Sequence, residues 1–261
     1  AGDGSSRLDG SPPVQHAAAE AVIAARERYK SLYVHLKRRG RADLATLKQM
    51  NTEGSAVNVG VKAAGDVPGV PVGTVFFART EMQVVGFHSK WLGGIDYAQD
   101  VEERYGKIDR DTEGLPLDPP RSFCTAVVSS GGYEDDEDAG EELWYTGEGG
   151  NDLLGTRRQE GSQKMKGGNA ALVNSMEQCL PVRLLRFLGK DFEDSYTQRK
   201  YSYDGLYDVK EYKVERGQRG HAVFKFRLVR RAGQTPLRED AGTRLHERLV
   251  GLAMRDGTMK E

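Results

Sequence analysis

The sequence contains very little cysteine and no long apolar run. Its 261 residues include only two cysteines, Cys124 and Cys179. Two cysteines exclude a disulfide scaffold and cannot by themselves build a structural zinc site. No stretch approaches the roughly 18 consecutive apolar residues of a membrane-spanning helix. We therefore expect a protein of a reducing intracellular compartment that has no membrane partner.

An excess of charge of either sign is also absent. The chain has 38 Lys and Arg against 39 Asp and Glu, a net charge of −1. The overall field therefore does not attract nucleic acid, and such a partner would require a local basic face. Hydrophobic residues make up 38% of the chain, which is enough for one globular core at this length.

The sequence motifs of several enzyme classes are missing as well. The chain has no GxxxxGK[ST], HExxH or GxSxG motif, and its five histidines stand singly. The acidic run from Glu134 to Asp138 lacks the ligand spacing of a calcium-binding loop, so a solvated charged segment is the better interpretation. The sequence predicts a non-enzymatic protein with no metal ion or other cofactor.

A helix is predicted near the N-terminus. Residues 1–13 consist largely of Gly, Ser, Asp and Pro and are expected to form a disordered linker. Beyond Val14, apolar side chains recur at three- and four-residue steps, which is typical of one helix face. The stripe consists of Val22, Ala25, Tyr29, Leu32, Tyr33 and Leu36. Cations and a glycine in Lys37–Gly40 predict the end of this helix.

A second, shorter helix is expected directly afterwards. It would run from Asp43, as its N-cap, to Met50, with Leu44 and Leu47 pointing inward. The two helices predict a helical hairpin over residues 14–66. A basic helix lying on a membrane surface is the weaker alternative.

After Val67 the sequence has strand-like segments separated by glycines. The 32 glycines of the chain suit a turn-rich β fold more than a helical one. Candidate strands are Thr74–Ala78, Met82–Phe87, Cys124–Val128, Val182–Phe187, Leu206–Val214 and Ala222–Val229. Apolar and basic residues alternate in Phe224–Arg230, which predicts one core face and one cationic face. We expect an α+β fold, with a twisted sheet or barrel over residues 67–236 and a helical tail at residues 237–261.

Four short motifs occur in order within this predicted β domain. They are Pro68–Gly73, Gly93–Tyr97, Val128–Asp136 followed by Leu143–Gly147, and Tyr201–Tyr207. Together they resemble the SRA domain, also called the YDG domain after Tyr203, Asp204 and Gly205. The branch most similar to this chain is the SUVH class of histone methyltransferases. The resemblance implies an SRA-like twisted β-barrel with flanking helices, in a nuclear chromatin protein that binds 5-methylcytosine in double-stranded DNA by base flipping.

The resemblance also implies which residues form the base pocket. A flipped cytosine needs stacking on both faces, hydrogen bonds on its Watson–Crick edge and room beside C5. Tyr133 and Tyr145 are similar to the two stacking aromatics. Asp136 resembles the carboxylate that accepts a hydrogen bond from the exocyclic amino group, which thymine lacks. The pocket wall would contain Ser130, Gly131, Gly132 and Thr146. Glu148 replaces the small residue that UHRF-type ubiquitin ligases place beside the methyl group.

Two loops are similar to those with which the family fills the hole left in the duplex. The loop entering from the minor groove would consist of Trp91, Leu92, Gly93 and Gly94, and an apolar wedge is chemically sensible there. The major-groove loop would contain Thr156, Arg157 and Arg158. Thr156 replaces the asparagine of UHRF-type domains. We therefore expect similar binding of hemimethylated and fully methylated sites, in CG and non-CG contexts.

DNA phosphates require cations, and several basic side chains stand near these motifs. They are Arg157, Arg158, Lys164, Lys166, Arg199, Lys200, Lys225 and Arg227. A solvated face explains any one of them equally well, so they are weaker candidates than the pocket residues. Asp204, by contrast, is expected to be structural, in a turn-forming Asp-Gly pair before the strand that starts at Leu206.

Alternative functions remain open at this point. The chain could read another modified cytosine, such as 5-hydroxymethylcytosine. It could also be the DNA-binding fragment of a SUVH-like histone H3 lysine methyltransferase whose catalytic SET region lies outside this chain, with histones as further partners. A nuclease module fused to an SRA fold would need a metal-binding carboxylate and lysine cluster, which we do not find in the sequence.

Overall fold

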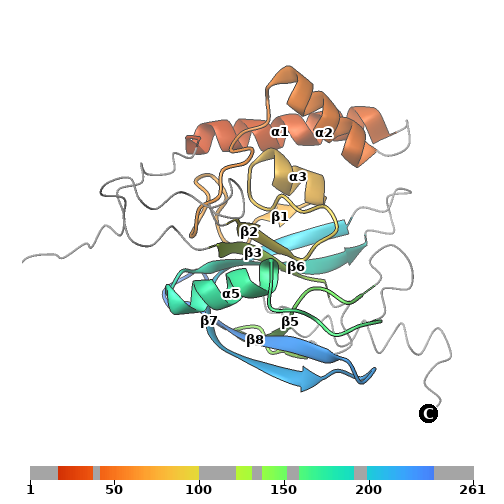
Figure 1. The fold of residues 1–261 in the computed structure, drawn as a ribbon. Helices are drawn as coiled ribbons and strands as arrows, with labels where there is room; N and C mark the ends of the chain where they lie inside the picture. Colours follow the sequence, from red (N-terminus) through yellow and green to blue (C-terminus); the bar gives the residue numbers. More distant parts are fainter. Residues whose placement is uncertain are drawn as a thin grey trace, which may run out of the picture.

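The structure is a computed structural model in which helices lie on both sides of one curved sheet (Figure 1). It describes residues 17–37, 42–99, 122–130, 137–151, 159–190 and 199–237. The helices in these ranges are α1 (Ala19–Leu36), α2 (Ala42–Glu53), α3 (Arg79–Val84) and α5 (Gly168–Glu177). The strands are β1 (Val75–Phe76), β2 (Ile95–Ala98), β3 (Phe123–Ser129), β4 (Glu137–Asp138), β5 (Glu142–Thr146), β6 (Val182–Lys190), β7 (Arg199–Arg216) and β8 (Ala222–Arg230). The predicted α+β fold is confirmed. The predicted linker at residues 1–13 and nearly all of the predicted tail lie outside the described residues.

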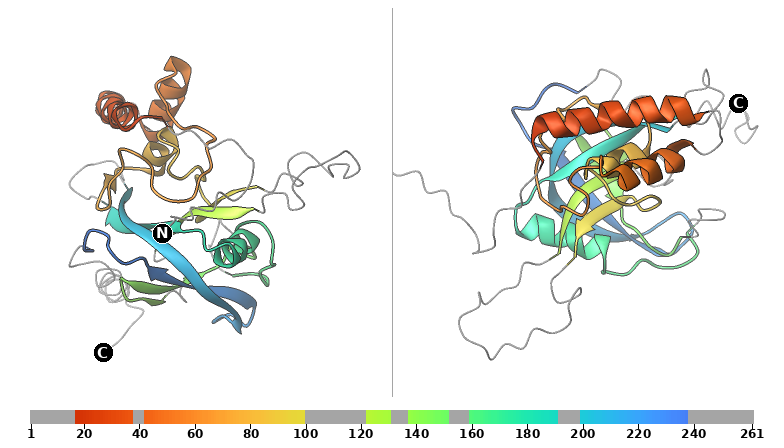
Figure 2. Two further views of the ribbon diagram at one scale, coloured as in Figure 1. Left: turned by 90° about the vertical axis from the view of Figure 1, so that its left-hand side faces the viewer. Right: turned by 90° about the horizontal axis from the view of Figure 1, so that it is seen from above.

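The long strand β7 connects the two halves of the sheet. The strand order is β2-β3-β6-β7-β8-β5-β4, and β1 pairs separately with β7. Strand β7 pairs with β6 along its first half and with β8 along its second half, and the register shifts in both pairings. Such irregularities bend a strand and increase its twist. The sheet therefore curves, and β7 and β8 extend together as a hairpin (Figure 2).

Each side of the sheet packs against its own hydrophobic core. Helices α1, α2 and α3 cover the first core, and α5 covers the second. Strand β3 contributes to both, because Val128 belongs to the first core and Val127 to the second. A strand buried on both faces reads as a continuous apolar run rather than an alternating one. This explains why β3 could be predicted from its sequence.

The sequence predicted the first N-terminal helix more accurately than the second. All six residues of the predicted stripe are the buried residues of α1, so this prediction is confirmed. Their burial against the sheet also speaks against a helix lying on a membrane. In α2 the buried residues are Ala42, Thr46 and Met50. Leu47 is half-buried and packs against the first core as predicted, whereas Leu44 is half-buried and does not belong to that core. Asp43 lies within the first turn of α2 rather than before it.

Polar contacts connect α1 to α3 and the sheet. Arg26 donates to the buried carboxylate of Glu81 at 3.0 Å and to the Val75 carbonyl at 3.0 Å. The hydroxyls of Tyr29 and Thr80 are hydrogen-bonded at 2.6 Å, with both side chains fully buried. Burial raises the pKa of Glu81, although the Arg26 guanidinium opposes this shift. The helices and the sheet therefore share one core, and we expect them to unfold together.

Replacing Tyr29 with Phe tests this shared core. The variant leaves the Thr80 hydroxyl buried without its partner, which is expected to cost about 1–3 kcal/mol of unfolding free energy. The same replacement at Tyr212, which is 41% exposed, serves as the control and is expected to change little. Urea denaturation, monitored with two different probes, should show a single transition in each variant. A separate early transition for the N-terminal helices would contradict a shared core.

One predicted strand is a helix. Residues Met82–Phe87 were expected to be extended, but α3 spans Arg79–Val84 and its residues Met82 and Val84 are fully buried. A short apolar run that is buried on several sides has no readable periodicity, so helix and strand cannot be distinguished from it. Glu81 supports the helix start by accepting a hydrogen bond from the Phe77 amide at 2.7 Å. Elements β2, β4, β5 and α5 were not among the predicted elements.

The motif Tyr203-Asp204-Gly205 lies inside β7 and is not a turn, so the predicted turn is wrong. Its role is nevertheless structural, because Asp204 accepts hydrogen bonds from Arg186 and Ser202, both at 2.6 Å. Gly205 has a φ of 107°, and a Cβ there would lie 2.5 Å from the Gln234 side-chain oxygen. A larger residue would meet both a strained backbone and a steric clash. The motif thus forms an irregularity at which β7 bends.

Candidate nucleic-acid interface

The described residues of the predicted pocket lie at the ends of β3 and β5. Ser130 is half-buried and follows β3 directly, whereas Tyr145 and Thr146 end β5 and are 2% and 1% exposed. The ring of Tyr145 packs close to Gly94, where an added Cβ would lie 2.4 Å from the phenolic oxygen. Four further predicted pocket residues lie outside the described residues: Gly131, Gly132, Tyr133 and Asp136. Their roles stay predictions.

Glu148 lies where three segments of the chain meet. Its Oε1 accepts a hydrogen bond from the Gly168 amide at 2.9 Å, at the start of α5. Its Oε2 lies 3.9 Å from the position that a Cβ on Gly93 would take. Burial raises the pKa of Glu148, while the Gly168 amide and the Lys90 ammonium oppose the shift. The structure therefore brings Glu148 next to the predicted minor-groove loop.

Two buried amide side chains, which no sequence motif indicated, hold the backbone of Gly147 and Glu148. Asn169 bonds both the amide and the carbonyl of Glu148, at 2.8 and 2.9 Å. Gln163 donates to the Gly147 carbonyl at 2.6 Å and accepts from the Phe224 amide at 2.8 Å. A Cβ on Gly147 would lie 2.5 Å from the Asn169 oxygen, so only glycine fits there. Single amide residues of this kind belong to no motif, so nothing in the sequence marked them.

Trp91 and Leu92 form the tip of a short loop between α3 and β2. Each is 43% exposed, which is unusual for large apolar side chains in this structure. At the base of the loop, the Ser89 amide and hydroxyl donate to Asp96 at 3.0 and 2.7 Å. The Gly94 carbonyl accepts a hydrogen bond from the Val128 amide at 2.9 Å, which joins the loop to β3. The predicted wedge is therefore exposed at its tip and fixed at its base.

A buried group of charged and polar side chains lies under this loop. Burial raises the pKa of Asp96, but His88, Lys62 and Ser89 outweigh burial and lower the pKa to about 2. Burial lowers the pKa of His88 to about 4, so its ring is neutral near pH 7. The neutral ring can donate from Nε2 to the Gly94 carbonyl, 3.1 Å away. Charge and hydrogen bonding thus support a fixed loop base.

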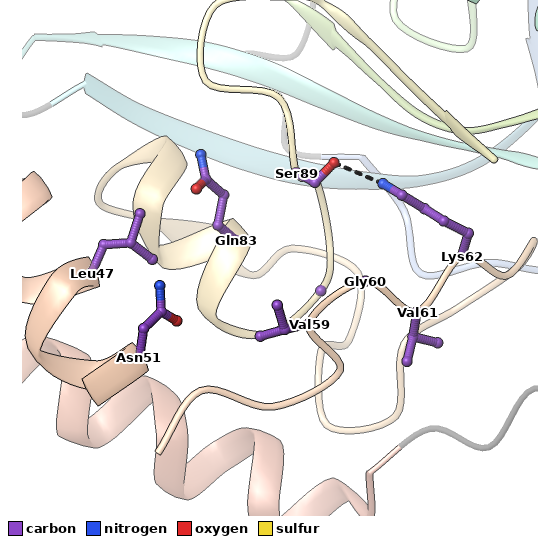
Figure 3. Close-up of a pocket in the computed structure, with 9 residues that line it drawn as sticks. Leu47, Asn51, Val59, Gly60, Val61, Lys62, Gln83 and Ser89 are labelled. Atoms are coloured by element: carbon purple, nitrogen blue, oxygen red, sulfur yellow. Dashed lines mark hydrogen bonds between the residues drawn. The ribbon is translucent and has the colours of Figure 1, made fainter. Parts of the chain in front are cut away.

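A cavity of about 100 Å³ adjoins this group on the side of the N-terminal helices (Figure 3). Lys62 and Ser89 lie at its edge and are hydrogen-bonded at 2.8 Å. The other lining residues are Leu47, Asn51, Val59, Gly60, Val61, Gln83 and Gly86. None of the predicted pocket residues lines this cavity, so it is separate from the predicted base pocket.

The base of the predicted major-groove loop is also close to Glu148. Asn151 and Gln159 form an isolated β-bridge, and the Gln159 side chain donates to the Gly149 carbonyl at 2.8 Å. The bridge brings both ends of the loop together near Gly149. Three predicted contact residues, Thr156, Arg157 and Arg158, lie outside the described residues.

The predicted phosphate contacts fall into two groups. Lys164 and Lys166 are exposed directly before α5, and Lys200 is half-buried in β7. The backbone of Arg199 lies in β7, but its side chain is outside the described part of the chain. Lys164, Lys166 and Lys200 stay candidates for phosphate contacts.

The side chains of Lys225 and Arg227 are not available for phosphate contacts. Lys225 is 2% exposed, and its ammonium lies 3.9 Å from Glu215. Arg227 forms ion pairs with Glu142 at 2.7 Å and with Glu211 at 3.0 Å. The face of β8 that was expected to be cationic is thus buried at one position and neutralised at the other. We leave both residues out of the interface.

Within the described residues, no group of three or more His, Cys, Asp or Glu side chains could hold a metal ion. In the same residues, none of the helices is both long and apolar enough to cross a membrane.

The chain corresponds to a known class of domain. The model of the SAD/SRA domain family matches residues 63–234. The chain belongs to the SAD/SRA domain family, as the four sequence motifs predicted.

Particular relatives place the chain near the SUVH proteins. It is 41% identical over 201 residues to "Histone-lysine N-methyltransferase, H3 lysine-9 specific SUVH4" of Arabidopsis thaliana, which covers 77% of this chain and 30% of the relative. This chain therefore spans about 30% of the length of that relative.

Solved structures of similar proteins contain modified DNA. KRYPTONITE in complex with mCHG DNA and SAH matches with a TM-score of 0.71 and 35% identity, over 85% of this chain and 45% of that chain. The SUVH5 SRA domain in complex with fully methylated CG DNA matches with a TM-score of 0.52 and 37% identity, over 68% of this chain and 99% of that chain. The same domain bound to fully hydroxymethylated CG DNA matches with a TM-score of 0.53 and 38% identity, over the same shares.

Proposed function

We propose that this chain is a non-enzymatic reader of modified DNA, which binds 5-methylcytosine in a duplex by flipping the base into a pocket. One observation carries the proposal: the exposed loop of Trp91 and Leu92 lies directly beside Tyr145 and Glu148. A protein that extrudes a base must both hold that base and fill the gap left behind. The proximity of the loop to Tyr145 and Glu148 supports assigning both tasks to this part of the chain.

The energetics of base flipping agree with the residue types present. Removing a cytosine from the stack costs a few kcal/mol. Stacking between Tyr133 and Tyr145 would return about 1–3 kcal/mol for each face of the base. Asp136 would accept a hydrogen bond from the exocyclic amino group and so select cytosine over thymine. Trp91 and Leu92 would occupy the vacated position from the minor groove.

Similar proteins support both the ligand and its context. KRYPTONITE and the SUVH5 SRA domain are described in complexes with methylated CHG and fully methylated CG DNA. A further KRYPTONITE complex contains methylated CHH DNA and an H3 peptide. We therefore propose a nuclear chromatin role for this chain. Any histone methylation would belong to a SET region outside these residues.

A fluorescent duplex tests base flipping directly. A 2-aminopurine placed beside a 5-methylcytosine gains fluorescence when its neighbour leaves the stack. Titration with the protein should raise the fluorescence of the methylated duplex but not of the unmethylated duplex. A Trp91→Ala and Leu92→Ala double variant should reduce the rise, because the gap is no longer filled. Tight binding of methylated DNA without any rise would contradict the flipping mechanism.

Strand selectivity gives a second prediction. Threonine has one short hydroxyl, so Thr156 cannot make the two-point contact of an asparagine amide. The neighbouring arginines could hold a phosphate or a guanine but would not sense a methyl group on the opposite strand. Competition between matched hemimethylated and fully methylated CG duplexes is expected to give affinities within a few-fold. A preference above about tenfold, or about 1.4 kcal/mol, for the hemimethylated duplex would contradict this prediction.

Recognition of 5-hydroxymethylcytosine is the second candidate function. It is favoured by the half-buried carboxylate of Glu148, because a carboxylate can accept a hydrogen bond from a hydroxymethyl group. The complex of the SUVH5 SRA domain with hydroxymethylated DNA agrees with it. Replacing Glu148 with Met, which has no acceptor oxygen, should weaken binding of the hydroxymethylated duplex more than that of the methylated duplex. Equal weakening would leave 5-methylcytosine as the better assignment.

A further inference from the structure

Arg79 crosses the base of the loop that carries Trp91 and Leu92. It is the first residue of α3, so it comes from a different element than the loop. One of its terminal nitrogens, Nη1, donates to the Lys90 carbonyl at 3.3 Å and to the Gly93 carbonyl. Its Nε lies 3.4 Å from the Tyr201 hydroxyl, and the guanidinium is 5.6 Å from the centre of the Tyr201 ring. Both the loop and the sheet thus hold this side chain.

The two carbonyls bound by Arg79 stand on either side of the exposed tip. Lys90 precedes Trp91, and Gly93 follows Leu92. One guanidinium therefore ties together the two ends of a two-residue apolar tip. A guanidinium is planar and presents its donors in a rigid fork, which a lysine ammonium cannot reproduce.

Other contacts hold the base of the loop. Ser89 and Asp96 are joined at its base, and Gly94 is held by His88 and Val128. Arg79 donates to the carbonyls of both Lys90 and Gly93, directly beside the tip. Arg79 thus joins the two ends of the tip, in addition to the contacts that fix the base of the loop.

We propose that Arg79 is a positioning residue that keeps Trp91 and Leu92 in the conformation needed for insertion into the duplex. This inference rests on the proposed function, because it concerns the loop that fills the gap. A tip that is ordered before binding does not lose conformational freedom on binding, so preorganisation improves affinity. Arg79 need not touch DNA to have this effect.

The first test compares Arg79→Met with wild type in the absence of DNA. In a Trp144→Phe background, Trp91 becomes the sole tryptophan. We expect faster local anisotropy decay of Trp91 in Arg79→Met, with an unchanged overall rotation. Arg28→Met is the matched control, because Arg28 pairs with Glu53 on the surface of α1. Unchanged local motion of Trp91 in Arg79→Met would overturn the inference, whether or not the protein binds DNA.

The second test is a double-mutant cycle on binding of the methylated duplex. Arg79→Met is expected to weaken binding about tenfold, and Arg28→Met is not. In a Trp91→Ala and Leu92→Ala background, the further change Arg79→Met should have no added effect, because there is no tip left to position. Additive losses, together with a salt slope reduced by about one, would instead identify Arg79 as a phosphate contact.

Two further comparisons distinguish failure of the Arg79 inference from misfolding of the variant and from failure of the proposed function. Arg79→Lys retains the charge without the planar fork and should behave like Arg79→Met, so it replaces that variant if Arg79→Met does not fold. If wild-type protein binds methylated and unmethylated duplexes equally, the proposed function fails. The anisotropy comparison then still decides whether Arg79 positions the tip.

Discussion

Asp204→Ala is expected to lower the free energy of unfolding by about 3 kcal/mol. Asp204 is 4% exposed, and its carboxylate accepts a hydrogen bond from Arg186 at 2.6 Å. Removing one partner of a buried ion pair leaves the other charge poorly compensated. Arg186 keeps its contacts with Asp138 at 2.7 and 2.8 Å, so we expect the lower end of the usual range. In a domain of this size the melting temperature should fall by roughly 10 °C.

A neighbouring aspartate provides the control for this prediction. Asp208 lies on the same strand, but its side chain is 25% exposed and its ion pairs with Arg231 and Lys210 reach the surface. Asp208→Ala is expected to cost less than about 1 kcal/mol. Below its melting temperature, Asp204→Ala should retain the preference for methylated DNA. A wild-type melting curve for Asp204→Ala would show that the buried ion pair does not stabilise the fold.

Asp136→Ala is expected to lose about 1–3 kcal/mol of base discrimination while keeping the fold. The variant removes the acceptor proposed for the exocyclic amino group of the flipped cytosine. The measurement compares binding of matched duplexes carrying 5-methylcytosine or thymine at the target position. The difference in affinity between these two duplexes should become smaller by about one to two orders of magnitude.

Two other variants separate the proposed contact from general charge. Asp135→Ala removes an adjacent negative charge of the same acidic run and should leave the discrimination unchanged. Asp136→Asn keeps one acceptor oxygen, so its loss should be smaller than that of Asp136→Ala. A natively folded Asp136→Ala protein with an unchanged preference would contradict the assigned role.

Elements with a strong local pattern could be predicted from the sequence. The stripe of α1 was complete because a long helix with one buried face has a clear period. Strands β3 and β6 were found because their apolar runs are flanked by turn residues. Helix α3 was missed because six residues buried on several sides have no period. The wrong turn at Asp204 has a related cause, since an irregularity within a strand has the same residue types as a turn.

The candidate site was predictable only where a residue belongs to a motif. Motifs predicted Tyr145 and Glu148, whose roles stay predictions, but no motif indicated Gln163, Asn169 or Arg79. Each of these three acts through contacts with residues distant in the sequence, and such contacts leave no local pattern. Lys225 shows how a local pattern can wrongly indicate a contact residue. Its place in an alternating strand predicted exposure, whereas the neighbouring strands β5 and β7 bury it.

Titration of two duplexes that differ in a single methyl group tests the central claim most directly. Labelled duplexes with cytosine or 5-methylcytosine at one position should be titrated with the protein at several salt concentrations. Affinity should fall with salt for both duplexes, because phosphate contacts are common to both. The methylated duplex should bind at least about tenfold more tightly at every salt concentration, a difference of about 1.4 kcal/mol. Equal affinities over the whole salt range would contradict a reader of modified cytosine and would indicate binding through basic side chains alone.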